Sequence, residues 1–279
     1  MDADGSHIRV ISNDALSLQA FDPSSPDDFL SVSGLIAWSP DGSQLVAEIG
    51  VGLYLLVNAD GTHARVFNAL FPVWSPDGRY LASYTSISNA ASQNPSSEYT
   101  IALLDTQTFK TRLLDGLPGL NAEGLAWSPD GRYLAMTAQV NGPFQLVDAV
   151  VRVRPDGTGI KVLDQLQSGQ VQQLFWSPDS QKLAVAVQSF GGDQQGGQPD
   201  NGASLLVINA DGSHLHQVGF SDGGQPSWSP DGKHLIYTSP DGTALAIVDA
   251  SSQPTSRPRS LSAALDFLFA PCWSPLAGI

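Results

Sequence analysis

Three features of the sequence predict an all-β fold, a β-propeller built from four-stranded antiparallel blades. One tripeptide, Trp-Ser-Pro, occurs six times and contains every tryptophan of the 279-residue chain. Short apolar runs follow each of the first five copies in the same order, usually with Asp-Gly turns between them. The composition of 27 glycines and 19 prolines against four lysines and three glutamates disfavours helices.

The spacing of the six tryptophans indicates a repeat of propeller-blade length. Successive tryptophans are 36, 53, 49, 52 and 45 residues apart, and a unit of about 40 to 50 residues is typical of a four-stranded blade. A tryptophan that recurs once per blade beside a turn is expected to pack between blades, whereas a surface row for sugars or peptides is the alternative. The six are Trp38, Trp74, Trp127, Trp176, Trp228 and Trp273.

The residues after each tryptophan predict a tight turn between the first and second strands. Five of the six copies continue as Ser-Pro-Asp, and four of these five end in Gly, with Ser180 as the exception. Proline fixes φ early in the turn, aspartate can accept a backbone hydrogen bond, and glycine tolerates positive φ.

Three further strands are predicted in each unit. A leucine stands seven residues after each of the first five tryptophans, within an alternating run such as residues 79–85 that predicts the second strand. An apolar run such as residues 53–57 predicts the third strand, and a run such as residues 64–67 predicts a short fourth. Four antiparallel strands in meander order make one blade.

These motifs resemble a known repeat. The pattern Trp-Ser-Pro-Asp-Gly-[Arg/Lys]-x-Leu-[Ala/Ile], followed by Val-x-[Asn/Arg]-x-Asp-Gly-[Ser/Thr], is similar to the TolB-like β-propeller repeat, a relative of WD-type repeats, and it covers nearly the whole chain. The resemblance implies a docking platform in an envelope complex, or a sensor or accessory domain of a larger bacterial protein.

The two ends of the sequence predict a shared blade. The sixth copy reads Trp273-Ser-Pro-Leu-Ala-Gly-Ile279, while Asp4-Gly-Ser-His matches the third-strand turns at Asp60 and Asp211. We therefore expect residues 1–279 to form one propeller domain, with six blades of which one is incomplete and contributed by both termini. This arrangement predicts an excerpt of a longer protein.

Variation in length places the candidate binding surface in loops. From tryptophan to the third-strand aspartate the five units measure 22, 31, 29, 35 and 21 residues. The additional residues are predicted to form loops between the second and third strands, at 86–98, 139–148 and 189–203. In a meander blade these loops lie on the same side as the connections between blades, so they are expected to share one face.

This loop face contains the candidate partner-binding residues. Aromatic anchors are predicted at Phe144 and Phe190, and an acidic part at Asp148, Asp193 and Asp200. The alternative is that these Gln-, Gly-, Ser- and Asn-rich segments are solvated loops without a partner.

Charge and motif content exclude several functions. The net charge of -14 disfavours nucleic acid as a partner, because phosphate binding requires a Lys/Arg surface. Of the 24 aspartates, 11 precede glycine and are explained by turns. No Gly-x-Ser-x-Gly, His-Glu-x-x-His or Walker-type motif occurs, and the lone cysteine, Cys272, rules out a disulfide within one chain. We expect no catalytic residues, no metal-binding residues and no cofactor, with a divalent cation in a central channel left open.

The sequence thus predicts a monomeric, non-enzymatic module that binds a protein or peptide through its loop face or channel mouth, without inserting into a membrane. The alternative is an accessory or sensor propeller of a larger peptidase, kinase or glycan-active enzyme whose chemistry lies outside this segment. Scarce lysines, the Ser/Gln-rich loops and the resemblance suggest an extracytoplasmic location in a bacterium, with a cytoplasmic location as the alternative.

Overall fold

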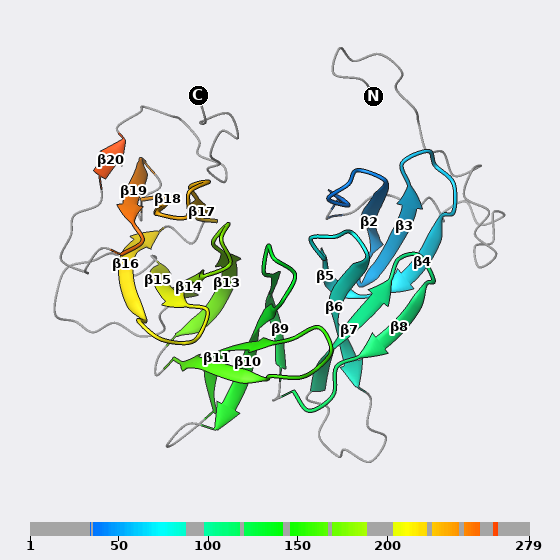
Figure 1. Ribbon diagram of the computed structural model, residues 1–279, viewed down its shortest axis with the longest axis horizontal. Helices are drawn as coiled ribbons and strands as arrows, with labels where there is room; N and C mark the ends of the chain where they lie inside the picture. Colours follow the sequence, from blue (N-terminus) through cyan, green and yellow to red (C-terminus); the bar gives the residue numbers. More distant parts are fainter. Residues whose placement is uncertain are drawn as a thin grey trace, which may run out of the picture. The chain divides into compact units, whose positions relative to one another are not determined.

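The computed structural model describes Gly34 and residues 36–87, 98–117, 120–141, 146–166, 169–188, 203–221, 225–239, 243–251 and 259–261. These residues form strands and turns, and none of them is helical (Figure 1). Contacts divide the chain into two compact units, residues 1–85 with 103–111 and residues 86–102 with 112–279.

The strands follow one another in sets of four, which we call blades 1 to 5. Blade 1 contains β1 (Ile36–Trp38), β2 (Gln44–Gly50), β3 (Leu53–Asn58) and β4 (Arg65–Asn68). Blade 2 contains β5 (Leu70–Trp74), β6 (Tyr80–Ile87), β7 (Glu98–Asp105) and β8 (Lys110–Leu113). Blade 3 contains β9 (Leu120–Trp127), β10 (Leu134–Asn141), β11 (Leu146–Val153) and β12 (Lys161–Gln165). Blade 4 contains β13 (Gln170–Trp176), β14 (Lys182–Gln188), β15 (Ala203–Asn209) and β16 (His216–Ser221), and blade 5 contains β17 (Ser227–Trp228), β18 (His234–Thr238), β19 (Leu245–Asp249) and β20 (Arg259–Leu261).

Sheet topology confirms the predicted all-β class and the meander of four strands. Blades 1, 4 and 5 are separate four-stranded sheets with their strands in sequence order. Blades 2 and 3 form one eight-stranded sheet in which β7 pairs with β9 at Tyr99 and Leu120.

A shared hydrogen-bond network forms each Trp-Ser-Pro-Asp turn. In blade 1 the Ser39 hydroxyl donates to Asp41 Oδ1 at 2.6 Å and accepts the Gln44 N–H at 2.9 Å, while Asp41 Oδ1 also accepts the Ser43 N–H at 3.0 Å. The same serine-to-aspartate bond measures 2.5 to 2.7 Å in blades 2 to 5. The motif therefore encodes a hydrogen-bonded turn of one geometry in all five described copies.

This network favours the ionised aspartate. The hydrogen bond from Ser39, followed by those from Ser43, lowers the pKa of Asp41 to about 2. The equivalent serine bond is likewise the main cause that lowers the pKa of Asp77 and of Asp231. Asp41, Asp77 and Asp231 thus act as charged acceptors within their own turns.

Ser180 replaces the turn glycine in blade 4, and the structure gives the reason. Its φ of 60° lies in the left-handed region that favours glycine. Its hydroxyl accepts the Asp130 backbone N–H of blade 3 at 3.0 Å. The serine therefore contributes a hydrogen bond between blades that glycine cannot make.

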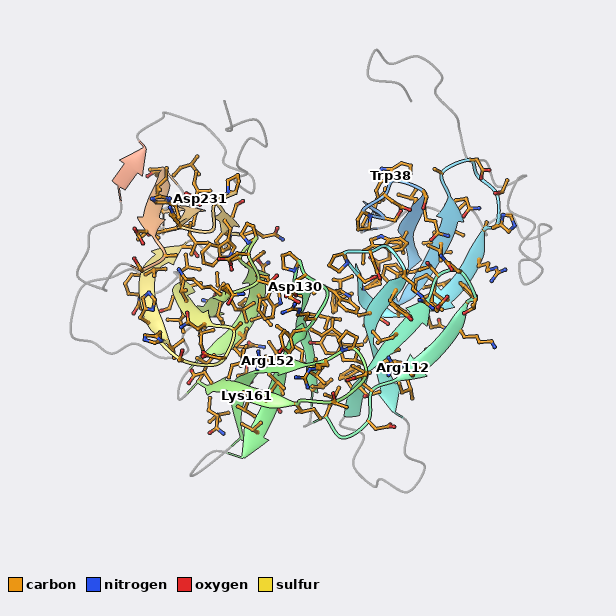
Figure 2. All side chains as sticks on the ribbon, in the orientation of Figure 1. Trp38, Arg112, Asp130, Arg152, Lys161 and Asp231 are labelled. Atoms are coloured by element: carbon orange, nitrogen blue, oxygen red, sulfur yellow. The ribbon has the colours of Figure 1, made fainter. Side chains whose placement is uncertain are left out.

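Tryptophans connect consecutive blades through their indole nitrogens. The Nε1 atoms of Trp74, Trp176 and Trp228 donate to the carbonyls of Ala37, Ala126 and Phe175, at 3.2, 3.2 and 2.9 Å. Each acceptor is the residue directly before the tryptophan of the preceding blade. Trp127 Nε1 is buried without an acceptor among the described residues. Trp38 is 56% exposed, and no described blade precedes it (Figure 2).

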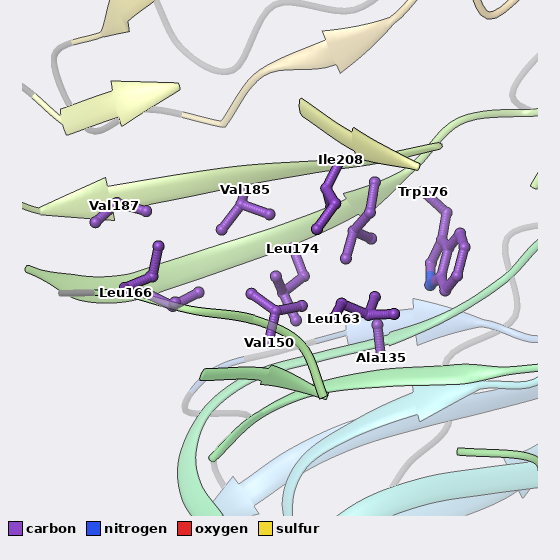
Figure 3. Close-up of a cluster of buried hydrophobic side chains, with 11 residues drawn as sticks. Ala135, Val150, Leu163, Leu166, Leu174, Trp176, Val185, Val187 and Ile208 are labelled. Atoms are coloured by element: carbon purple, nitrogen blue, oxygen red, sulfur yellow. The ribbon is translucent and has the colours of Figure 1, made fainter. Parts of the chain in front are cut away.

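Buried aliphatic clusters lie between the blades. One cluster joins Ala135 and Val150 of blade 3 with Leu174, Trp176 and other residues of blade 4 (Figure 3). A second joins blades 4 and 5, and a third joins blades 1 and 2. Alternation along each strand supplies both faces of a blade, so blade 4 contributes to a buried apolar cluster on each side.

Side chains of the fourth strands form a second connection, from one blade to the last turn of the next. Arg112 and Lys161, labelled in Figure 2, donate to the backbone carbonyls of Pro155 and Asp211, both at 2.5 Å. The His216 Nε2 atom lies 2.9 Å from the Ala250 carbonyl oxygen. In blade 1, Arg65 stacks on Phe109 of blade 2, with its Cζ atom 5.0 Å from the ring centroid.

Candidate interaction site

Of the five predicted partner-binding residues, the structure describes only Asp148. Its side chain is 8% exposed, and its Oδ2 atom accepts the Val171 N–H of β13 at 3.2 Å. Its carbonyl accepts the Leu166 N–H at 2.8 Å. Asp148 therefore belongs to the buried contact between β11 and β13. The other four, Phe144, Phe190, Asp193 and Asp200, lie outside the described residues, as does Trp273.

The segment 139–148 is mostly strand, which corrects the predicted loop. Strands β10 and β11 remain paired from Gln139 opposite Asp148 to Asn141 opposite Leu146. Alternating apolar residues there, such as Val147, have a buried face available, so the added residues lengthen the hairpin. Segment 86–98 is described only at its ends, and of segment 189–203 only Ala203 is described.

The described face of β2–β3 turns and blade connections presents a different candidate, centred on Phe71. Phe71 is 55% exposed on β5, and Val51, at the tip of the β2–β3 turn, is fully exposed. The Ala69 N–H donates to the Gly52 carbonyl at 3.0 Å, which fixes the connection to blade 2 against this turn. Val51 and Phe71 therefore stand within one and two residues of this contact, on neighbouring segments.

Phe71 has an unfavourable backbone conformation. Its φ is 52°, a region that bulky side chains rarely adopt, and the following Pro72 further restricts it. The pairing of β5 with β6 is irregular between Leu70 and Val73, which marks a β-bulge. Bulges and left-handed residues of this kind re-aim side chains at functional sites.

Buried neighbours hold this conformation. The Phe71 N–H donates to the Tyr54 hydroxyl, a side chain that is 3% exposed. Burial, and next the nearby Glu48 carboxylate, raise the pKa of Tyr54, so it stays a neutral phenol. Glu48 is the cross-strand partner of Tyr54, so its negative charge lies close to the phenol that Phe71 contacts.

The arrangement offers groups that can bind a partner. An exposed ring, an exposed aliphatic residue and one carboxylate can anchor an apolar segment of a partner. Within the part of the chain that the structure describes, no group of three His, Cys, Asp or Glu residues could hold a metal ion. The described histidines are committed elsewhere: His63 and His214, for example, lie 3.1 and 3.0 Å from asparagine amides of their own turns.

Sequence reasoning missed Phe71 because it searched only the long loops. A usable signal exists, since the residue three positions before the tryptophan is Phe71 in blade 2 but Gly124 in blade 3 and Gln173 in blade 4. The bulge also occurs at this position in blades 3 and 4. Among the described residues of β5, β9 and β13, only Phe71 both lies in a bulge and has a positive φ.

Comparison with solved structures identifies the class of protein as a β-propeller. TolB from Acinetobacter baumannii superposes with a TM-score of 0.54 at 18% identity, over 77% of this chain and 51% of TolB. An oligogalacturonate lyase from Vibrio parahaemolyticus gives 0.57 at 14% identity over 81% of this chain and 64% of the lyase. The tricorn protease gives 0.56 at 10% identity over 85% of this chain and 28% of the protease. The chain thus spans about half of the TolB structure.

Among curated proteins, an uncharacterized protein of Agrobacterium fabrum (strain C58) is 28% identical over 214 residues, which are 71% of this chain and 67% of that protein. No family model matches the chain. In the described part of the chain we find no helix with the length and apolarity needed to cross a membrane.

Proposed function

We propose that this β-propeller is a non-enzymatic interaction module that binds a protein or peptide segment on the face bearing Phe71 and Val51. The observation that carries the proposal is the strained, exposed Phe71. A left-handed non-glycine residue costs about 1 to 3 kcal/mol, and folded proteins keep such residues mainly where they serve a site. The nearby apolar Val51 and charged Glu48 give the surface the mixed character of a binding face.

The fold supports the same conclusion. Blades 1 and 2 are connected by the Trp74 hydrogen bond and a buried cluster, and turns on such packed supports commonly carry recognition residues. The similarity to TolB, a propeller of bacterial origin, is consistent with an extracytoplasmic bacterial module.

Selection of displayed peptides tests the proposal. The full chain is immobilised, a random peptide library is panned against it, and an enriched peptide is synthesised with a fluorescent label. Its Kd is then measured by anisotropy with the wild-type chain, Phe71→Ala and Phe220→Ala. Phe220 is a matched control because it is a phenylalanine of similar exposure, 44%, on a different strand, β16.

We expect Phe71→Ala to weaken binding about tenfold or more, as for a central aromatic anchor, and Phe220→Ala to leave it unchanged. Failure to enrich any peptide, or equal loss in both variants, would refute the proposal. Melting temperatures of both variants establish that the fold is retained.

A second candidate function is an accessory propeller of a larger enzyme. The similarity to a lyase and a protease, of which this chain covers 64% and 28%, favours it. The full-length gene separates the two candidates. A hydrolase, lyase or kinase segment in the same gene would support the accessory propeller, and a gene without one, together with Phe71-dependent peptide binding, would support the interaction module.

A further inference from the structure

The edge of blade 3 combines exposed apolar side chains with cations. Leu113, Ile160 and Val162 are 46%, 38% and 38% exposed, and they account for three of the nine exposed large hydrophobic residues in the described part of the chain. Arg112, Arg154 and Lys161 are exposed beside them. We call these six residues the blade-3 edge.

Two contacts join β8 and its continuation to the β11–β12 turn. Arg112 donates to the carbonyl of Pro155, and a side chain at Gly116 would lie 3.9 Å from Ile160 Cδ1. Leu113 lies between these two contact points on β8 and its continuation. Arg154 and Lys161 flank the turn at 155–160 on either side. The end of β8 in blade 2 therefore lies against the turn that leads into β12 of blade 3, and Lys161 at the start of β12 is directed to the Asp211 carbonyl of blade 4.

The charge of this region contrasts with the remainder of the chain. Residues 110–161 contain six of the 13 lysines and arginines but five of the 27 acidic residues, a balance of +1. All other residues contain seven cations and 22 acids, a balance of -15. A mainly acidic chain thus carries six of its 13 lysines and arginines in residues 110–161, three of them in the blade-3 edge.

The acidic residue within the edge does not cancel these cations. Asp156 accepts hydrogen bonds from the hydroxyl and the N–H of Thr158, at 2.7 and 2.8 Å. These bonds, and next the charges of Arg154 and Arg112, lower the pKa of Asp156. Its carboxylate is directed into its own turn. Lys161 instead lies near Asp211, whose carboxylate likewise accepts hydrogen bonds within its own turn.

Protection of an edge strand explains only part of the pattern. Lysine and arginine on edge strands discourage pairing with other chains, and this accounts for Lys161 on β12 and Arg112 on β8. It does not account for Arg154, which follows β11 and lies in no strand. It also does not account for three exposed apolar residues on the same edge, which would promote aggregation.

We propose that the blade-3 edge is a second interaction surface, distinct from the Phe71 face, and that its partner is a protein segment with carboxylates next to aliphatic side chains. The aliphatic residues would pack on Leu113, Ile160 and Val162, while the carboxylates pair with the guanidinium and ammonium groups. The -15 balance elsewhere repels an acidic partner from the remaining surface and directs it to this edge.

A designed peptide tests the proposal. The probe is a fluorescein-labelled peptide of about eight residues that alternates Glu and Ile, and its counterparts carry Gln or Lys in place of Glu. Anisotropy gives the Kd for the wild-type full chain and for Arg154→Gln and Ile160→Ser. The matched control is Arg132→Gln, because Arg132 is equally cationic and exposed but pairs with Asp130 in its own turn.

We expect the Glu-Ile peptide to bind, the Gln and Lys peptides to bind about tenfold more weakly or not at all, and both edge variants to weaken binding about five- to tenfold. Arg132→Gln and Phe71→Ala should leave the Kd unchanged, which keeps this proposal separable from the Phe71 site. Binding should weaken as NaCl is raised from about 50 to about 500 mM.

Three results would overturn the proposal: no binding of the Glu-Ile peptide, equal binding of the Gln peptide, or equal loss in Arg132→Gln. Sedimentation of the free chain adds a fourth. If the chain self-associates and Arg154→Gln abolishes the association, the edge binds a second copy rather than a partner protein. If Arg154→Gln lowers the melting temperature, Arg154→Lys must restore peptide binding.

Discussion

The indole nitrogen of Trp228 lies 2.9 Å from the carbonyl oxygen of Phe175, the residue directly before the tryptophan of the preceding blade. Trp228→Phe keeps an aromatic ring and removes the donor. We expect the free energy of unfolding to fall by about 1 kcal/mol, the net value of one hydrogen bond. Urea unfolding measures it, with Trp38→Phe as the control because the Trp38 ring is exposed. Equal losses in the two variants would show that the hydrogen bond contributes nothing.

Ser180 tests whether a hydrogen bond between blades offsets an unfavourable φ. Ser180→Ala removes the acceptor for the Asp130 N–H and keeps the φ of 60°, so stability should fall by about 1 to 2 kcal/mol. Ser180→Gly removes the acceptor but relieves the backbone, so its stability should stay within about 0.5 kcal/mol of the wild type. Urea unfolding gives the free energy of unfolding of both variants. A Ser180→Gly variant that is less stable than Ser180→Ala would contradict this explanation.

The turn network gives stability a dependence on pH. The pKa of Asp41 in the folded chain is about 2, below its ordinary value of 3.8, so its contribution is present above pH 3.8 and is lost as the pH falls toward 2. Ser39→Ala removes the main cause of this shift. We expect the variant to lower the melting temperature more at pH 7 than near pH 2, and a difference independent of pH would contradict this account.

Phe71→Gly separates stability from binding at the proposed site. Glycine accepts the φ of 52°, so relief of the backbone should offset the loss of the partly exposed ring. We expect the variant to be as stable as the wild type or more stable by up to about 1 kcal/mol in free energy of unfolding, while peptide binding is lost. A loss of more than about 1 kcal/mol would show that the ring is mainly structural.

Tyr237 carries a buried hydroxyl without a hydrogen-bond partner among the described residues. Burial raises its pKa to about 12, so it stays a neutral phenol. Tyr237→Phe removes the unsatisfied group and should stabilise the chain by about 1 kcal/mol in thermal or urea unfolding. Gly219→Ala is a second test of the packing around this hydroxyl. A Cβ at residue 219 would lie 2.3 Å from the Tyr237 hydroxyl oxygen, so this variant should lower the free energy of unfolding. A destabilised Tyr237→Phe would reveal an acceptor for this hydroxyl.

Local periodicity and turn chemistry were sufficient to predict the blades. The second-strand residues Leu81, Leu134, Leu183 and Leu235 are all at most 1% exposed, as their alternating runs predict. The turn at Asp41 follows from proline, aspartate and glycine preferences that act within a few residues of each other. These properties are local, so a sequence displays them directly.

The candidate sites required information that local patterns do not contain. Phe71 is unusual because of its φ and the Tyr54 hydroxyl, which belongs to another blade. Asp148 was expected at the surface because its segment is long, but pairing with β10 extended the strand and Val171 of β13 buried the carboxylate. In both cases a neighbouring blade determines the exposure of the side chain.

The connections from the fourth strands suggest a rule for building new arrays of this repeat. Arg65, Lys161 and His216 each stand five residues after an Asp-Gly aspartate and reach the following blade. The position thus tolerates three different side chains provided that the group is long and can donate or stack. A consensus blade could therefore carry lysine there in every copy, which would raise the solubility of a designed array and strengthen each junction in one substitution.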